Sequence, residues 1–198
     1  RMVDESGLLV SPNAFLPAAE RYHLMTKIDK WVIRNQFDYL SKNPEHLASL
    51  ELCSINLSGP SLTAPGFLQA VIDYLNYYQI PAEKICFEIT ETAAISNLTD
   101  ATNFIDAMHK KGCSFALDDF GTGLSSFAYL KYLPVDFLKI DGVFVKGIVD
   151  DPIDYAMVKS IHEVGRVMGK KTVAEFVENS DVVLKLKEIG VDYSQGYG

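Results

Sequence analysis

The stretch that decides the fold is Phe115-Ala-Leu-Asp-Asp-Phe-Gly-Thr-Gly-Leu-Ser-Ser126. A buried strand is predicted from Cys113, and it runs directly into two adjacent carboxylates, Asp118 and Asp119, followed by a glycine-framed loop. Like charges placed side by side at the end of a core strand are unfavourable unless a cation lies between them. We therefore expect a metal site here. Neighbouring strand side chains point apart, so the pair suits two cations better than one.

Composition narrows the class of protein. The 198 residues are 48% hydrophobic and 22% charged, as in an ordinary globular domain. The formal net charge of -8 argues against binding to a nucleic-acid polymer, although metal ions could still attract a small anionic substrate. No apolar run reaches membrane length. Three cysteines in apolar runs predict buried free thiols, which favours a cytoplasmic location; membrane tethering of a longer parent protein stays open.

Both ends of the sequence indicate a fragment. The chain starts at Arg1 without an initiator methionine and stops at Gly198 within a Gly-Tyr-Gly turn. We expect residues 1–198 to be a single domain truncated at both ends.

After a helical first third, strands alternate with helices. Apolar spacing from Leu24 to Leu40 predicts a helix that buries Trp31. Strands are predicted over 52–58, 84–90, 113–117, 137–140, 171–174 and 191–194; helices are predicted over 65–78, 98–111, 125–132, 143–168 (interrupted near 151–152) and 181–189. This alternation is typical of a parallel sheet with right-handed crossovers.

A polar residue lies at or just past the carboxyl end of each predicted strand. These residues are Asn56, Glu88, Asp118 with Asp119, Lys139, Glu175 and Gln195. Such positions converge on one face of a TIM-like (β/α)8 barrel, whereas an open doubly wound sheet, the alternative, would spread them along an edge. A closed barrel needs eight strands, so two N-terminal strands are expected to be missing from this chain.

The candidate ligands are oxygen donors, which select Mg²⁺ or Mn²⁺ over zinc or copper. Two such ions about 4 Å apart are a common arrangement for hydrolysing a phosphodiester. Lys139 would add a fixed positive charge that holds the attacking water or stabilises developing negative charge.

Six motifs in order resemble those of the EAL-domain family. They are Ile55-Asn-Leu-Ser58, Glu88-Ile-Thr-Glu91, Leu117 to Ser126, Leu138-Lys-Ile-Asp141, Val173-Ala-Glu-Phe-Val-Glu178 and Gln195-Gly-Tyr197. The resemblance spans essentially the whole chain. It implies a cyclic di-GMP phosphodiesterase that produces linear pGpG with two Mg²⁺ or Mn²⁺ ions, a barrel with one antiparallel strand, and a homodimer often fused to sensory or cyclase-like domains.

The resemblance also implies a role for each matching residue. Asn56, Glu88 and Asp118 would bind one metal and Asp119 the second; Lys139 and Glu175 would hold and activate water, and Gln195 would contact water or metal. Glu91 would brace the loop of Phe120, Gly121, Thr122 and Gly123, which couples metal binding to dimer contacts. Arg1, Asp141 and Glu178 would lie near the substrate.

Two departures from the family pattern stand out. The Glu-Ala-Leu signature is absent; Ser11-Pro-Asn-Ala-Phe15 matches the segment that follows it, so Arg1 fits the signature arginine. Phe176 replaces a glycine common in the family, and we expect this loop position to tolerate the change. A catalytically inactive receptor for cyclic di-GMP is the main alternative function, and a Mg²⁺-dependent barrel lyase is a weaker one.

Overall fold

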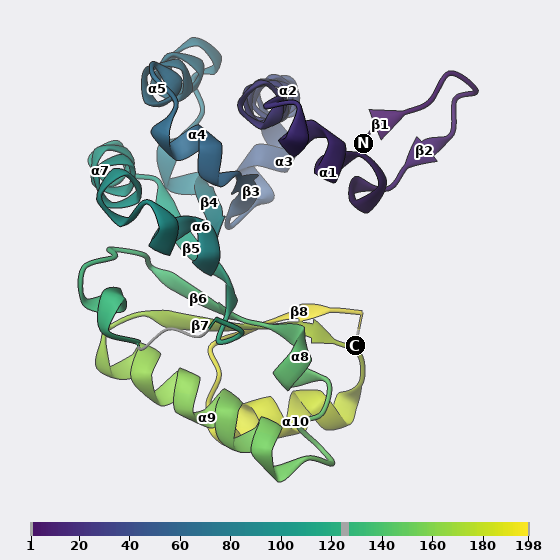
Figure 1. The fold of residues 1–198 in the computed structure, drawn as a ribbon, viewed down its shortest axis with the longest axis vertical. Helices are drawn as coiled ribbons and strands as arrows, with labels where there is room; N and C mark the ends of the chain where they lie inside the picture. The colour runs from purple at the N-terminus through teal and green to yellow at the C-terminus, as the bar shows by residue number, and fades with distance from the viewer. Residues whose placement is uncertain (1, 124–126, 198) are drawn as a thin grey trace.

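A curled sheet of six strands forms the centre of the molecule. The computed structural model describes residues 2–123 and 127–197 (Figure 1). Its strands are β3 (Cys53–Leu57), β4 (Ile85–Thr90), β5 (Ser114–Phe120), β6 (Phe137–Ile140), β7 (Lys171–Val177) and β8 (Tyr193–Gly196). They pair in chain order, and every neighbouring pair is parallel. The predicted α/β architecture is therefore confirmed, as an open part of a TIM-like barrel.

Helices connect the strands and cover the outer face of the sheet (Figure 1). They are α4 (Gly59–Thr63), α5 (Phe67–Tyr78), α6 (Glu91–Ser96), α7 (Leu98–His109), α8 (Gly142–Val145), α9 (Pro152–Val167) and α10 (Ser180–Ile189), with short 3-10 turns η1 (Ala82–Lys84) and η2 (Phe127–Lys131). Part of the helix predicted over 125–132 lies outside the described residues. Across the described ranges, no helix is both long and apolar enough to cross a bilayer.

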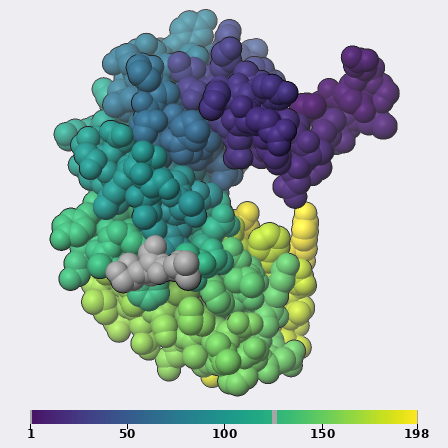
Figure 2. Space-filling model, viewed as in Figure 1, coloured from purple at the N-terminus to yellow at the C-terminus, as the bar shows by residue number. Residues whose placement is uncertain are grey.

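The N-terminal segment contains a hairpin that the sequence analysis missed. Strands β1 (Met2–Val3) and β2 (Leu9–Val10) pair antiparallel as a separate two-stranded sheet. The Asp4 carboxylate accepts hydrogen bonds from the amides of Ser6 and Leu8, which closes the turn. Two-residue strands are too short to produce an alternating pattern. In Figure 2 this purple hairpin projects away from the body.

Helix α2 (Met25–Lys42), which follows α1 (Pro12–Arg21) and precedes α3 (Pro44–Ser49), buries a different face from the one predicted. Its buried residues are Met25, Asp29, Ile33, Phe37 and Leu40. Trp31 is 57% exposed, so its predicted place in the core was wrong. The apolar spacing predicted the wrong face because the buried face contains an aspartate, Asp29. This carboxylate accepts hydrogen bonds from Ser58 and Ser61.

Aromatic rings fill the space between the sheet and its helices. Phe87 on β4 and Phe115 on β5 pack against each other, and both contact Phe104 of α7. All three rings are buried, as are the free thiols of the three cysteines. This core is contributed by consecutive strands, so it holds the strand ends in a fixed order along one side of the sheet.

Candidate metal and catalytic site

One lysine joins carboxylates from three strands at the carboxyl end of the sheet. The Nζ atom of Lys139, on β6, lies 2.8 Å from an oxygen of each of Glu88 on β4, Asp118 on β5 and Glu175 on β7. Lys139 is only 4% exposed. Parallel strands thus bring four of the predicted site residues into one cluster, as expected for groups at barrel strand ends.

The cluster carries more negative than positive charge, and its pKa values reflect this. Burial disfavours the charged form of Lys139, but its close contacts with the three carboxylates outweigh burial and raise its pKa. Burial, with the charges of Asp118 and Asp119, raises the pKa of Glu175 despite its contact with the lysine. Burial, followed by the charges of Asp118 and Asp141, also raises the pKa of Asp119. A bound cation would lower both carboxyl pKa values.

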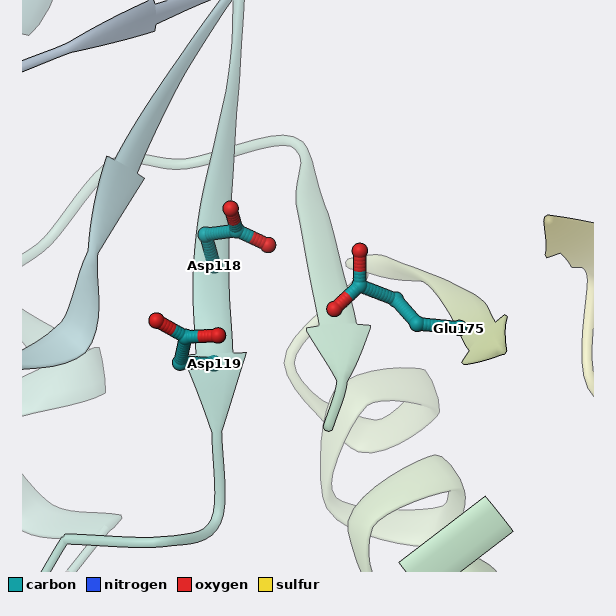
Figure 3. A group of neighbouring side chains, drawn as sticks. All are labelled: Asp118, Asp119 and Glu175. Carbon is teal, nitrogen blue, oxygen red and sulfur yellow. The ribbon is translucent and has the colours of Figure 1, made fainter. Parts of the chain in front are cut away.

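The residues present fit a metal ion. Asp118, Asp119 and Glu175 each offer a carboxylate oxygen, and these oxygens lie within 4.8 Å of one another. Figure 3 shows the Glu175 carboxylate reaching towards the two aspartates on β5. Within the described residues, the buried Oδ1 of Asp118 has no hydrogen bond of good geometry, although the lysine is close. An all-oxygen set with such an oxygen suits a hard divalent cation.

Two β-bulges, one in β5 and one in β7, orient the carboxylates of the site. Between Leu117 and Phe120, β5 advances three residues while β6 advances two. Between Ala174 and Val177, β7 makes the same slip against β8. Each bulge contains one non-glycine residue with positive φ, Asp119 (55°) on β5 and Phe176 (53°) on β7. The expectation that the paired aspartates point apart was therefore wrong: the bulge breaks the regular alternation.

Asn56 and Gln195 lie beside the cluster. Asn56 is the register partner of Glu88, so both side chains emerge on the same face of the sheet. Gln195 lines a cavity of about 530 Å³ together with Glu88 and Lys139. Neither side chain forms a hydrogen bond with another described residue, so their assigned roles stay predictions.

The residues predicted to lie near the substrate are not brought together as closely as the carboxylates around Lys139. Asp141 caps α8 by accepting a hydrogen bond from the Val143 amide at 2.7 Å, and its charge reaches Asp119. Glu178 is exposed beyond β7 and forms no ion pair within the described ranges. Arg1 lies outside the described residues.

Glu91 forms a hydrogen bond with the glycine loop. Its buried carboxylate accepts a hydrogen bond from the Gly121 amide at 3.1 Å. A Cβ at Gly123 would lie 3.0 Å from Glu91 Oε1, so the loop packs closely on the carboxylate. The Thr122 hydroxyl donates to the Asp119 carbonyl at 3.1 Å, and Phe120, the last residue of β5, is buried. Coupling of this loop to a dimer stays a prediction.

Near the site, Tyr129 was missed by the sequence analysis and Phe176 was placed wrongly by it. Tyr129 donates a hydrogen bond to Glu91 at 2.7 Å, and its position in a short 3-10 turn provided no periodic signal. Phe176 was predicted to lie in a tolerant loop, but it belongs to β7 and covers Gly142, where a Cβ would collide with the ring. The Lys146 ammonium lies 4.6 Å from the centroid of the same ring.

Comparison with known proteins gives a consistent family. The EAL domain model matches residues 1–198. Curated relatives include the cyclic di-GMP phosphodiesterases PdeB of Shewanella oneidensis (48% identity) and PdeF of Escherichia coli (39% identity). Each match covers all of this chain but only 23% and 26% of the relative, respectively. The chain therefore spans about a quarter of the length of these relatives.

Similar solved structures indicate the same family. The FimX EAL domain of Pseudomonas aeruginosa bound to c-di-GMP superposes with a TM-score of 0.91 at 32% identity, covering 100% of this chain and 78% of that one. The PaMucR phosphodiesterase in complex with c-di-GMP gives a TM-score of 0.91 at 29% identity, covering 100% and 80%. With its parallel strand order and its lysine-centred carboxylate cluster, this chain belongs to the EAL domain family.

Proposed function

We propose that this chain hydrolyses one phosphodiester of cyclic di-GMP to give linear pGpG. The observation that carries the proposal is the buried Lys139, in contact with Glu88, Asp118 and Glu175 from three other strands. Such a site can bind divalent cations and still retain a fixed positive charge for a phosphate. Relatives named as cyclic di-GMP phosphodiesterases support the choice of substrate.

The cofactor that fits best is a pair of Mg²⁺ or Mn²⁺ ions. The resemblance to the family implies that Asn56, Glu88 and Asp118 would hold one ion and Asp119 the other, and the oxygen donors of these side chains suit such ions. When bound, such ions lower the pKa of water and neutralise charge on the phosphate.

The chain's own residues would divide the remaining work. Glu175 would take the proton of the attacking water, and the raised pKa of its carboxyl suits a general base. The Lys139 Nζ atom would hold that water or the charge developing on the phosphate. The water oxygen forms the new bond to phosphorus while the bond from phosphorus to the ribose oxygen on the opposite side breaks. That oxygen takes a proton from solvent and leaves as a hydroxyl, which opens the ring. Gln195, at the cavity wall, would orient the water.

The resemblance to the family supports further assignments. Arg1, Asp141 and Glu178 would contact the substrate, and the Glu91-braced loop would connect the site to a homodimer interface. Fusion to sensory or cyclase-like domains fits the short span of this chain within its relatives, and a cytoplasmic location fits a nucleotide substrate.

A receptor that binds the dinucleotide without cutting it is the second candidate. It is consistent with the FimX EAL domain structure with c-di-GMP bound, although the PaMucR phosphodiesterase is also in complex with c-di-GMP. Against it, each ligand position of the family that falls within this chain holds a matching residue: Asn56, Glu88, Asp118, Asp119 and Glu175. The glutamate of the absent signature is a further ligand in the family.

The deciding experiment measures binding and turnover together. The full-length protein that contains this chain is incubated with cyclic di-GMP and Mn²⁺, and products are separated by chromatography, with cyclic di-AMP as the matched control. We expect pGpG to appear and cyclic di-AMP to persist. Calorimetric binding without any pGpG would instead establish the receptor.

A further inference from the structure

The buried carboxylate of Glu91 accepts hydrogen bonds from two residues that are close in sequence, Gly121 and Tyr129. Glu91 is 4% exposed and begins α6, directly after β4. Its Oε1 atom accepts a hydrogen bond from the Tyr129 hydroxyl at 2.7 Å, and its Oε2 atom accepts one from the Gly121 amide at 3.1 Å. Each carboxylate oxygen is thus occupied, so the rotation of the group is determined by both bonds together.

Tyr129 is suited to hold the carboxylate in place. It lies in η2, partly buried, with its ring against the core. Burial, and then the hydrogen bond to Glu91, raise the pKa of its hydroxyl, so the group stays protonated and acts as a donor. Two residues before it, the Phe127 ring packs against Phe120 at 5.3 Å between centroids.

The other partner of Glu91, Gly121, lies next to the carboxylate cluster around Lys139 in the sequence. Gly121 follows Phe120 and lies two residues after Asp119, whose backbone has a φ of 55°. Thr122 donates to the Asp119 carbonyl, so the turn from Asp119 to Thr122 is closed by its own hydrogen bond and anchored by Glu91. Any rotation of the Glu91 carboxylate would therefore shift the segment that presents Asp119.

We propose that Tyr129 is a positioning residue for the site, because its hydroxyl fixes the Glu91 carboxylate that holds the Gly121 amide and hence the Asp119 turn. Tyr129 forms no hydrogen bond with the carboxylates around Lys139, and the proposal gives it no contact with the substrate. The effect on turnover rests on the proposed function, whereas the effect on the loop does not.

The test compares Tyr129→Phe with Tyr132→Phe in the full-length protein. Tyr129→Phe retains the ring and removes one hydroxyl. Tyr132 is 70% exposed, and its hydroxyl has no partner among the described residues, so Tyr132→Phe makes the same chemical change without touching Glu91. The readouts are amide hydrogen exchange at Gly121, calorimetric Mn²⁺ affinity, and kcat and KM for cyclic di-GMP.

We expect Gly121 exchange to quicken about tenfold in Tyr129→Phe, the size associated with one charge-assisted hydrogen bond, with weaker Mn²⁺ binding. We expect kcat to fall by a similar factor with KM little changed, because binding contacts stay intact. Tyr132→Phe should match the wild type in all four measurements. Equal exchange and equal Mn²⁺ affinity in the two variants would overturn the proposal.

A second comparison distinguishes a specific effect on the Gly121 loop from general destabilisation of the protein. Glu91→Gln can satisfy only one of the two donors, so it should also quicken Gly121 exchange. The double variant with Tyr129→Phe should be no worse than the more impaired single variant, since both changes break one unit. Additive effects would contradict a shared role. If the wild type itself yields no pGpG, the proposed function fails while the exchange and Mn²⁺ results still decide the role of Tyr129.

Discussion

Lys139 Nζ lies 2.8 Å from Glu175 Oε1, and this contact joins the proposed water-holding group to the proposed base. The same ammonium also contacts Glu88 and Asp118, so it balances part of the charge of one buried carboxylate and two partly buried ones. The lysine therefore has a structural effect that is separate from catalysis, and each of the two effects can be measured.

Replacing Lys139 by Met should destabilise the metal-free protein. Breaking a buried ion pair leaves an uncompensated charge and costs about 3–5 kcal/mol. Added Mn²⁺ should restore much of this loss, because the cation replaces the missing positive charge. Urea unfolding with chelator and with Mn²⁺ measures both effects, and the exposed Lys187→Met is the control. A Lys139→Met protein as stable as the control would contradict the role of the ammonium.

Asp119→Asn should abolish most activity without unfolding the protein. Asp119 is exposed, and asparagine tolerates its positive φ of 55°, so the backbone is preserved. Loss of a metal ligand should lower turnover by about two orders of magnitude or more. Turnover with Mn²⁺ and circular dichroism check this, with the exposed Asp73→Asn as the control. Near-normal hydrolysis by Asp119→Asn would rule out the two-metal site.

Glu175→Gln should separate binding from turnover. The change removes the proposed base and leaves the other cluster residues in place, so kcat should fall about 10²–10⁴-fold. Affinity for cyclic di-GMP should change little. Calorimetry beside a hydrolysis assay provides the comparison. If affinity and turnover disappear together, Glu175 has a mainly structural or binding role.

The buried thiols predict a loss of stability at alkaline pH. Burial raises the pKa of Cys113 to about 12, from 9.0 for an ordinary thiol. The folded state thus retains a proton that the unfolded chain releases, so the free energy of unfolding falls between pH 9 and 12, by about 1.4 kcal/mol per pH unit for this thiol. Urea unfolding at pH 8 and pH 10 measures the slope. Cys113→Ala should make it shallower; an unchanged slope would refute the assignment.

Gly142→Ala should be destabilising because of Phe176. A Cβ at Gly142 would overlap the Phe176 ring, and such overpacking costs about 1–3 kcal/mol. Phe176→Gly removes the ring and suits the positive φ, so the double variant should regain stability. Gly169→Ala is the control: its Cβ meets nothing within 4 Å, but its φ of 69° strains an alanine there, so it is destabilising for a different reason and Phe176→Gly should not rescue it. Thermal unfolding of the single and double variants decides the matter.

Part of the site could be predicted because parallel strands end at one side of a sheet. Glu88, Asp118, Lys139 and Glu175 each follow an apolar run, and strand alternation with helices implies that their side chains converge. The sequence by itself thus determined the order of strands, the face of the candidate site and the oxygen-donor chemistry of its side chains.

Only the tertiary structure decided how these groups meet. The bulges at Asp119 and Phe176 depend on the register of each strand against the next, and that register is a property of paired strands. The hydrogen bond from Tyr129 to Glu91 joins residues 38 positions apart, and the buried face of α2 contains Asp29, whose carboxylate accepts hydrogen bonds from distant serines. Contacts of this kind leave no periodic trace in the sequence, because they form between segments that the fold alone brings together.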